Sequence, residues 1–241
     1  MMSKNGAPKR IVITGANRGL GLDFVRQWLE RDEEICALAR DPGASESLQA
    51  LCKSYPEALM TIPCDVADDA SVREACARIE RRWDTVDLLL NNAGVYGTGR
   101  GTPISGLDFD EIRSVFEVNA LGAIRMVREV EALLRRAGNA RIVNMTSLMG
   151  SIEDNGSGGV WAYRMSKAAL NMATRNMAHD FASASIPCIV LHPGWVRTDM
   201  GGPAAPLGVS EAVASMIETI ESVGMEHTGT LLDRNGEAVP W

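Results

Sequence analysis

Two hydrophobic patterns alternate along this chain of 241 residues. Short, continuously apolar runs such as Ile11–Ile13 are typical of strands buried on both faces. Longer stretches with apolar residues on one face, such as Leu22, Val25 and Leu29, are typical of amphipathic helices. The pattern predicts strands near 10–14, 34–39, 59–64, 86–90, 140–146, 187–191 and 229–232, and helices near 19–31, 45–54, 69–82, 108–136, 161–184 and 209–223.

The regular alternation of strands and helices favours a parallel sheet with right-handed helical crossovers. We find no linker, no low-complexity tract and no internal repeat between the predicted elements. Residues 1–241 are therefore expected to form one α/β domain. Its predicted fold is a doubly wound parallel sheet of about seven strands with helices on both faces.

A glycine-rich turn joins the first predicted strand to the first helix, with the sequence Thr14-Gly-Ala-Asn-Arg-Gly-Leu-Gly21. Gly15 permits a tight turn, Gly19 lets a pyrophosphate approach the backbone, and Gly21 lets helix and strand pack closely. The free N–H groups at the start of the helix would then face the anion. Taken alone, the three glycines also fit an ordinary turn.

Arginines mark the place where a dinucleotide site would recognise the adenosine ribose. An acidic residue after the second strand selects NAD, whereas an arginine accommodates the 2′-phosphate of NADP. Here Ala39 stands at that position and Arg40 follows it, and Arg18 would approach the same phosphate from the glycine turn. The pattern favours NADP, although Asp41 could serve an NAD ribose.

Two further loops follow strand ends on the same side of the predicted sheet. Asp65, before Val66, could accept a hydrogen bond from the adenine amino group or help to start the next helix. Asn92, Ala93 and Gly94, after a second asparagine, are small or amide residues suited to close contact with a ribose. The asparagines could also brace neighbouring strands.

A serine, a tyrosine and a lysine form the candidate catalytic group. Ser147 ends a predicted strand, and sixteen residues later Tyr163 and Lys167 lie four residues apart on a predicted helix. That spacing places the phenol and the ammonium on one face, one turn apart. A neighbouring cation favours the phenolate of a tyrosine, whose ordinary pKa of about 10 is too high for acid–base work near neutrality.

These motifs together resemble those of the short-chain dehydrogenase/reductase family, whose fold is of the Rossmann type. The resemblance covers residues 9–235 and includes Thr14–Gly21, Asn91–Gly94, the Ser147, Tyr163 and Lys167 triad, and Asn119 as a fourth catalytic member. More narrowly, Asn17–Gly21, His192–Met200 and the final Pro240-Trp241 are similar to C-factor and sniffer-type NADPH carbonyl reductases.

The resemblance implies a mechanism and a cofactor site. Tyr163 would give a proton to a carbonyl oxygen held by Ser147, Lys167 would lower the tyrosine pKa, and Asn119 would hold a water at the cost of locally disturbed helix geometry. The residues expected to contact the cofactor are Gly15, Asn17, Arg18, Gly19, Leu20, Gly21, Arg40, Asp65, Val66, Asn92, Ala93, Gly94, Tyr163, Lys167, Pro193, Gly194, Val196 and Thr198.

The expected function is therefore NADPH-dependent reduction of a small aldehyde, ketone or quinone. Tyr96, Met149 and Trp195, with Ser147, are candidate walls of the substrate pocket, although each of the first three could equally belong to the core. Only about nine residues follow Met200 before the next helix, which predicts an open site. Two alternatives remain: an NADP(H)-binding signalling protein of the C-factor type, and a 3-oxoacyl-carrier-protein reductase.

Composition excludes several other classes. With 24 basic and 31 acidic residues the formal charge is −7, which offers no footprint for nucleic acid or an anionic membrane. No segment approaches the ~18 apolar residues of a membrane span, and no signal peptide pattern precedes the first strand. Five cysteines without a Cys-x-x-Cys pair, and three scattered histidines, predict a reduced cytoplasmic protein without a metal site.

A homodimer or homotetramer is expected, because the family commonly pairs the helices near 108–136 and 161–184 with their copies. The gap between Ser147 and Tyr163 has room for a loop, and its glycines argue against an extra helix that would cover this face. An apolar stripe on the second helix could meet the partner or simply pack on the sheet; its residues are Leu170, Met177 and Phe181.

Overall fold

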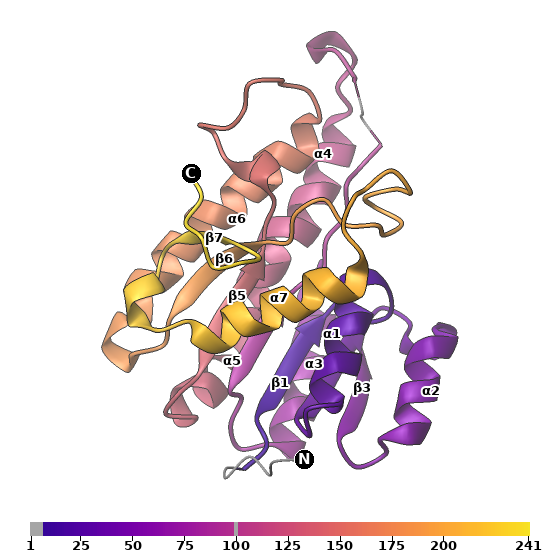
Figure 1. Ribbon diagram of the computed structural model, residues 1–241, viewed down its shortest axis with the longest axis vertical. Helices are drawn as coiled ribbons and strands as arrows, with labels where there is room; N and C mark the ends of the chain where they lie inside the picture. The colour runs from indigo at the N-terminus through magenta and orange to yellow at the C-terminus, as the bar shows by residue number, and fades with distance from the viewer. Residues whose placement is uncertain (1–6, 99–100) are drawn as a thin grey trace.

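The computed structural model describes residues 7–98 and 101–241. Seven strands in this part of the chain form one sheet in the order β3-β2-β1-β4-β5-β6-β7, and all neighbours are parallel (Figure 1). The expected fold class is confirmed. The strands are β1 (Arg10–Thr14), β2 (Glu34–Ala39), β3 (Leu59–Pro63), β4 (Leu88–Asn91), β5 (Arg141–Met145), β6 (Cys188–His192) and β7 (Leu231–Asp233).

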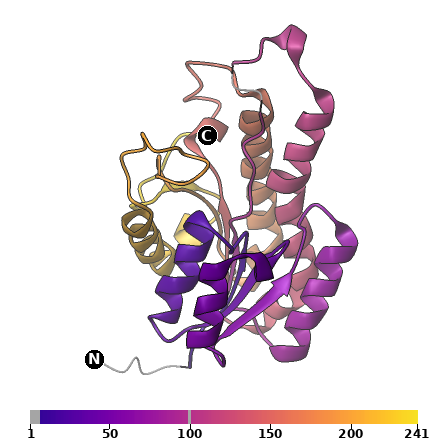
Figure 2. The same cartoon turned by 90° about the vertical axis from the view of Figure 1, so that its right-hand side faces the viewer.

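Helices cover both faces of the sheet, as Figure 2 shows with the molecule turned by 90°. One face carries α1 (Gly19–Leu29), α2 (Glu46–Ser54) and α7 (Val209–Ser222), packed on one apolar cluster. The other carries α3 (Asp69–Arg82), α5 (Gly122–Arg136) and α6 (Trp161–Asp180), packed on a second cluster. The strand residues alternate between the two clusters, so that Ile11 and Ile13 face the first and Val12 the second.

The crossover after β3 creates the place where a ligand can bind. The chain passes from β3 at one edge to β4 on the other side of β1, so that Ile11 pairs with both Ile35 and Leu88. At such a switch point the loops after the two central strands diverge and leave a crevice at the carboxyl ends of the strands. The glycine turn after β1 and the loop after β4 both lie at this crevice.

The long helix predicted over 108–136 is interrupted in the structure. It consists of α4 (Phe109–Phe116), a π-helical turn called η3 (Glu117–Leu121), and α5. Asp108 caps the first part as expected, because its side chain accepts from the N–H groups of Asp110 and Glu111. Hydrophobic periodicity does not reveal one widened turn, so the sequence pattern predicts one continuous helix.

The apolar stripe on α6 follows the second of the two expectations. Leu170, Met177 and Phe181 are all buried within the chain and pack on the sheet side. The segment 151–160 between the serine loop and α6 contains no helix, as expected from its glycines. None of the helices in the described part of the chain is both long and apolar enough to cross a bilayer.

Candidate active site

The glycine turn closes tightly against the loop that follows β4. Gly15 and Gly19 adopt left-handed backbone conformations with φ of +64° and +55°. A Cβ on Gly21 would lie 2.2 Å from the carbonyl oxygen of Gly15, so only glycine allows this approach of helix and turn. Asn92 donates from Nδ2 to the carbonyl oxygens of Thr14 and Gly15 at 2.9 and 3.1 Å, which braces the two loops as expected.

A groove of about 600 Å³ runs from the glycine turn to the candidate catalytic residues. All predicted cofactor residues line it except Gly194 and Val196. Val196 is buried beside Leu207 in the segment 193–208, which follows β6. Lining residues that the sequence reasoning missed are Cys64, Ala67, Val95, Ser114, Val118, Met145, Thr146, Asp199 and Met200. Several of them directly follow or precede a predicted motif, which is the only signal that the sequence carries for them.

The end of the groove beside the glycine turn carries both predicted arginines. Arg40 is exposed and lines the groove. Arg18 also lines the groove, but its guanidinium donates to Asp199 Oδ2 at 2.8 Å, with both side chains well exposed. The ion pair therefore joins the glycine turn to the segment after β6, a contact that the sequence reasoning did not anticipate.

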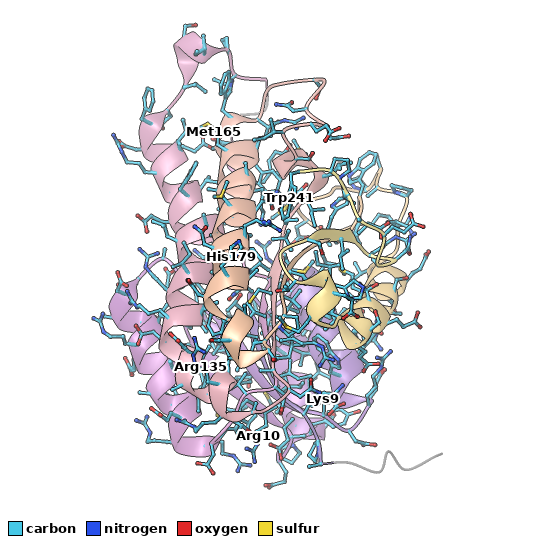
Figure 3. All side chains as sticks on the ribbon, turned by 90° about the vertical axis from the view of Figure 1, so that its left-hand side faces the viewer. Lys9, Arg10, Arg135, Met165, His179 and Trp241 are labelled. Carbon is cyan, nitrogen blue, oxygen red and sulfur yellow. The ribbon has the colours of Figure 1, made fainter. Side chains whose placement is uncertain are left out.

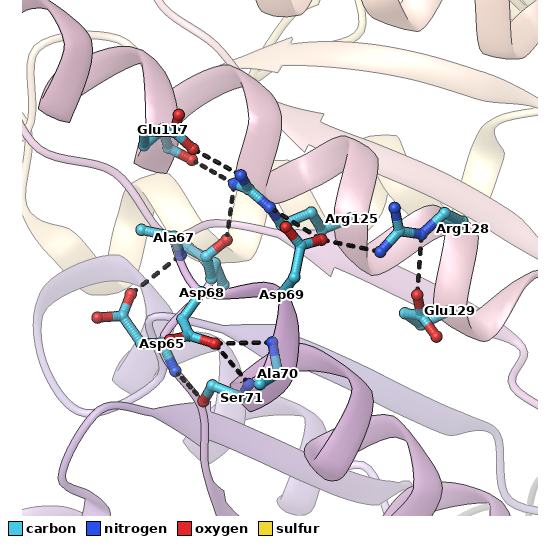
Figure 4. Close-up of polar contacts among 11 residues, drawn as sticks. Asp65, Ala67, Asp68, Asp69, Ala70, Ser71, Glu117, Arg125, Arg128 and Glu129 are labelled. Carbon is cyan, nitrogen blue, oxygen red and sulfur yellow. Dashed lines mark hydrogen bonds and ion pairs between the residues drawn. The ribbon is translucent and has the colours of Figure 1, made fainter.

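The loop after β3 is held by its own acidic residues, as Figure 4 shows. Asp65 accepts from the N–H of Ala67 at 3.0 Å and lines the groove. Asp68 caps α3 by accepting from the N–H groups of Ala70 and Ser71. The two positions expected for an acid in this loop are thus taken by different residues. Asp68 caps the helix, and Asp65 lies beside the groove.

Arg125 joins this loop to the widened turn η3 (Figure 4). Its guanidinium donates to Glu117 Oε2 at 2.6 Å, lies 3.4 Å from Asp69 Oδ1, and donates to the carbonyl oxygen of Val66 at 3.4 Å. Desolvation lowers the pKa of Arg125, but the bonds to both carboxylates outweigh it and raise the pKa overall. The cation consequently stays charged at the junction of the groove and the π-helical turn.

Asn119 lies in that π-helical turn and is almost fully buried. Its Oδ1 accepts from the N–H of Val95 at 2.8 Å, and its Nδ2 donates to the carbonyl oxygen of Val95 and to Ser166 Oγ at 2.8 and 2.9 Å. The locally disturbed helix geometry implied by the resemblance is therefore present. It places the amide against the loop after β4 and the first turns of α6.

Ser147 and Tyr163 meet beside the groove, where their side chains share a hydrogen bond. Ser147 leads into a short 3-10 helix, η4 (Leu148–Gly150), and its Oγ accepts from the N–H of Met149 at 3.2 Å. Tyr163 is 7 % exposed, and burial raises its pKa to about 12 against the lowering effect of the Ser147 hydrogen bond. The tyrosine therefore holds its proton at neutral pH.

Lys167 lies one turn beyond Tyr163, with Nζ 5.7 Å from the centre of the tyrosine ring. It is 4 % exposed and donates to the carbonyl oxygen of Met145 at 2.8 Å. Burial lowers its pKa to about 8. The expected lowering of the Tyr163 pKa is not found, because desolvation disfavours the phenolate and also disfavours the ammonium that would stabilise it.

The candidate substrate walls behave differently from one another. Tyr96 packs its ring on that of Tyr163 with centroids 4.7 Å apart, and its hydroxyl lies 3.9 Å from Met149 Sδ. A second cavity of about 220 Å³ continues from Tyr96 and Tyr163 toward the start of α4. Trp195 is 56 % exposed and donates from Nε1 to the carbonyl oxygen of Gly201. Tyr96 and Met149 thus lie beside Tyr163, whereas Trp195 lies in the segment 193–208 that follows β6.

The sequence reasoning gave no role to two residues of this region, Asn171 and His192. Asn171 is buried one turn beyond Lys167 on the same face of α6, and it contacts Thr146 and Gly150 on either side of the serine. His192 ends β6 and accepts the N–H of Leu148. The four-residue spacing from Tyr163 through Lys167 continues to Asn171 and could have indicated it. The place of His192 at a strand end, before Pro193, is a weaker indication.

Several known proteins are similar to this chain in sequence or in structure. The family model described as short chain dehydrogenase matches residues 9–206. C-signal of Myxococcus xanthus is 43% identical over 156 residues, which cover 65% of this chain and 93% of that protein. Carbonyl reductase Sniffer of D. melanogaster superposes with a TM-score of 0.93 at 31% identity, covering 98% of this chain and 100% of that one.

A second solved structure is the NADPH-bound carbonyl reductase from chicken fatty liver. It superposes with a TM-score of 0.91 at 32% identity and covers 98% of this chain and 100% of that one. The parallel sheet, the glycine turn and the residues gathered around Tyr163 thus agree with a family match that spans most of the sequence. The chain belongs to the short-chain dehydrogenase family of oxidoreductases.

Proposed function

We propose that the protein reduces an aldehyde, ketone or quinone to an alcohol with NADPH as the reductant. The observation that carries this proposal is one groove that begins at the glycine turn and ends at Tyr163 and Lys167. The carbonyl reductases among its structural neighbours, one of them NADPH-bound, support the same chemistry.

The groove fits a dinucleotide in shape and in the chemistry of its lining. Gly19 has room on its open side, where a Cβ would come no closer than 3.6 Å to Thr198. The N-terminus of α1 faces the groove with a positive dipole, and Arg40 supplies a cation for a 2′-phosphate. A bound reduced nicotinamide would supply the hydride.

The side chains around Tyr163 divide the remaining work. Ser147 would hold the substrate oxygen by a hydrogen bond as negative charge develops on it. Tyr163, protonated at neutral pH because of its raised pKa, would donate its hydroxyl proton to that oxygen. Lys167 would replenish the proton of Tyr163 and hold the nicotinamide ribose, and Asn119 would support a water beyond it.

The direct test measures NADPH oxidation against a panel of aldehydes, ketones and quinones. We expect turnover with several of them and slower turnover with NADH at equal concentration. A panel that leaves NADPH unconsumed, while the cofactor demonstrably binds, would contradict the proposed activity.

A second function is favoured by one observation, the 43% identity to the protein named C-signal. In that case the chain would bind NADP(H) and act as a signal or regulator, and turnover would be incidental. The buried Tyr163–Lys167 pair favours catalysis, because cofactor sensing alone does not require a proton donor. Restoring the regulatory phenotype with a catalytically dead Tyr163→Phe protein would decide for the signalling role.

We also propose that the chain forms a homodimer through the outer faces of η3, α5 and α6. Figure 3 shows Met165 on the outer side of α6. Apolar side chains at least 39 % exposed recur on these elements, namely Leu121, Ile124, Met165 and Met172. Exposed apolar surface of this kind is typical of subunit contacts. Light scattering at micromolar concentration should give twice the 26.0 kDa of one chain or a multiple of it, and Met172→Glu should shift the mass toward the monomer.

A further inference from the structure

We infer that His192 is a positioning residue that fixes Ser147 toward Tyr163 by accepting the backbone N–H of Leu148. The inference rests on the proposed function, because it concerns the geometry of the same site. It adds a residue on β6 that is not itself among the residues lining the groove or the reacting groups named above. It also assigns a protonation state to that residue.

The bond in question lies one peptide away from the catalytic candidate. Leu148, which follows Ser147 directly, donates its N–H to His192 Nδ1 at 3.1 Å. The next N–H, that of Met149, caps the Ser147 hydroxyl oxygen. The two N–H groups belong to consecutive peptides, so a change in the orientation of the first peptide would also shift the N–H that donates to the serine hydroxyl oxygen.

Side chains of α6 hold three further polar groups of this segment. Asn171 Oδ1 accepts from the Thr146 hydroxyl at 2.6 Å, and its Nδ2 donates to the carbonyl oxygen of Gly150 at 3.2 Å. Arg164 donates to the carbonyl oxygen of Met149 at 3.3 Å. Neither an amide nor a guanidinium titrates near neutral pH. Among these contacts the histidine is therefore the one that responds to pH.

The bond requires a neutral imidazole. A ring nitrogen that accepts an N–H carries no proton, so the geometry assigns the tautomer with the proton on Nε2. Two carboxylates face the ring and raise its pKa, Asp233 from the neighbouring strand β7 and Asp154 from the segment after η4, but burial outweighs them and lowers the pKa of His192 below its usual value. His192 is thus neutral at pH 7.

Protonation of the ring would replace an acceptor by a donor. The imidazolium carries a proton on Nδ1, which would then face the N–H of Leu148, and the hydrogen bond would be lost. The segment after Ser147 would lose its hydrogen bond to His192 on β6, while Asn171 and Arg164 still hold it to α6. We expect the Ser147 hydroxyl to move away from its productive position, and displacements near 1 Å cost up to about 10²-fold in rate.

Two substitutions separate the hydrogen bond from the packing. His192→Asn places an amide oxygen near the position of Nδ1, so it accepts from Leu148 without titrating. His192→Leu fills the space but leaves the N–H of Leu148 without an acceptor. At pH 7 we expect the asparagine variant to keep kcat within about threefold, and the leucine variant to lose about tenfold or more in kcat. NADPH affinity should stay within about twofold in both, since the side chain at position 192 does not line the groove.

The pH dependence of turnover distinguishes this role from simple packing, because a packing role alone would not change with pH. Turnover of the wild type should fall on the acid side as His192 takes up a proton, below the ordinary imidazole pKa of about 6.5. That fall should disappear in His192→Asn. The same acid limb in both proteins, at equal kcat, would overturn the inference.

Hydrogen–deuterium exchange tests the same bond without turnover. After correction for intrinsic exchange, the amide of Leu148 should exchange faster in His192→Leu than in His192→Asn, and faster in the wild type at acidic than at neutral pH. Unchanged protection in all three proteins would refute the role of His192 even if carbonyl reduction is confirmed. Conversely, altered protection without turnover on any carbonyl would contradict the proposed function and leave the hydrogen bond established. If the leucine variant does not fold, the asparagine variant and the wild-type pH series carry both measurements.

Discussion

The two ends of the groove differ in their access to water. At the catalytic end Asn119, Tyr163 and Lys167 are 1, 7 and 4 % exposed. At the end beside the glycine turn Arg40 is exposed and the Arg18 side chain is 67 % exposed. Two unit charges 4 Å apart interact by about 1 kcal/mol in water and by about 4 kcal/mol at an effective dielectric constant of 20. A single polar group therefore has a larger effect at the catalytic end.

The pKa values follow this contrast. Burial alone lowers the pKa of Lys167 to about 8, and burial is the largest of the effects that together raise the pKa of Tyr163 to about 12. The pair holds one ammonium and one protonated phenol at neutral pH, the forms that proton donation requires. At the open end the arginines would recognise a ligand by charge, which salt can screen. We expect substitutions at the buried end to affect rate and those at the open end to affect cofactor choice.

The largest effect should come from Tyr163→Phe. The change removes one hydroxyl and little volume, so NADPH should bind nearly as before while turnover falls by about 10²–10⁴-fold, the usual contribution of a positioned proton donor. Steady-state rates and a fluorescence titration with NADPH measure the two quantities. Tyr96→Phe is the matched control, because it removes a hydroxyl from the adjacent ring, and its rate should stay within a few-fold of the wild type.

Lys167→Met should lower both turnover and cofactor affinity, because in the proposed mechanism one ammonium would serve both the tyrosine and the ribose. Losing a hydrogen bond from a charged group costs roughly 1.5–3 kcal/mol, which corresponds to about a 10- to 100-fold weaker NADPH affinity. Lys53→Met, on α2, provides a control for loss of a lysine. An unchanged dissociation constant in the Lys167 variant would mean that the ammonium does not reach the ribose.

The same variant tests the lowered pKa through stability. Between a folded-state pKa of about 8 and an unfolded value of about 10.4, the unfolded chain binds more protons, so the wild type should gain stability as pH rises through this window. The difference in unfolding free energy between Lys167→Met and the wild type should therefore change in favour of the wild type between pH 8 and 10. Denaturant titrations of the cofactor-free proteins at both pH values measure it, and a pH-independent difference would contradict the lowered pKa.

Arg40→Ala should weaken NADPH by about tenfold and leave NADH unaffected, because only NADPH carries the 2′-phosphate. The exposed position places the effect near the lower end of the range for charged hydrogen bonds. Dissociation constants for both cofactors at two salt concentrations measure the effect, with Arg82→Ala on α3 as the control. Equal weakening of both cofactors would remove the basis for NADP selectivity.

The smallest effect is expected from Asp199→Asn. The carboxylate neutralises Arg18 across the mouth of the groove, so its removal should free that guanidinium for the 2′-phosphate. An exposed ion pair contributes about 0–1 kcal/mol, so NADPH affinity should rise less than about fivefold and NADH affinity should not change. The gain should vanish at high ionic strength. Weaker NADPH binding would show instead that the ion pair supports the groove.

The sequence predicts the sheet and the glycine turn well because both depend on local signals. Apolar β-branched runs and glycine spacing determine where β1 ends and α1 begins, and the structure agrees to within a residue or two. The widened turn at Asn119 was implied only by resemblance, because one extra residue per turn leaves no trace in the hydrophobic pattern.

Contacts between distant segments could not be predicted in this way. The bond from Leu148 to His192 spans 44 residues, and the ion pair of Arg18 with Asp199 spans 181. Residue type alone does not choose among the many acceptors that such a donor could find. The predicted direction of the Tyr163 pKa shift was wrong for a related reason, because burial depends on packing that the local sequence does not specify.

The central position of β1 has a consequence for how the chain folds. Its partners are β2, which follows closely, and β4, which is made about 75 residues later in the order of synthesis. The amide of Asn92 that braces the glycine turn comes from the same late segment, 78 residues beyond Thr14. A nascent chain that has emerged only as far as β3 thus exposes one unpaired edge of a very apolar strand, and such edges are sites of misassociation. Pairing of β4 with β1 consequently both protects that edge and brings in the amide that braces the glycine turn.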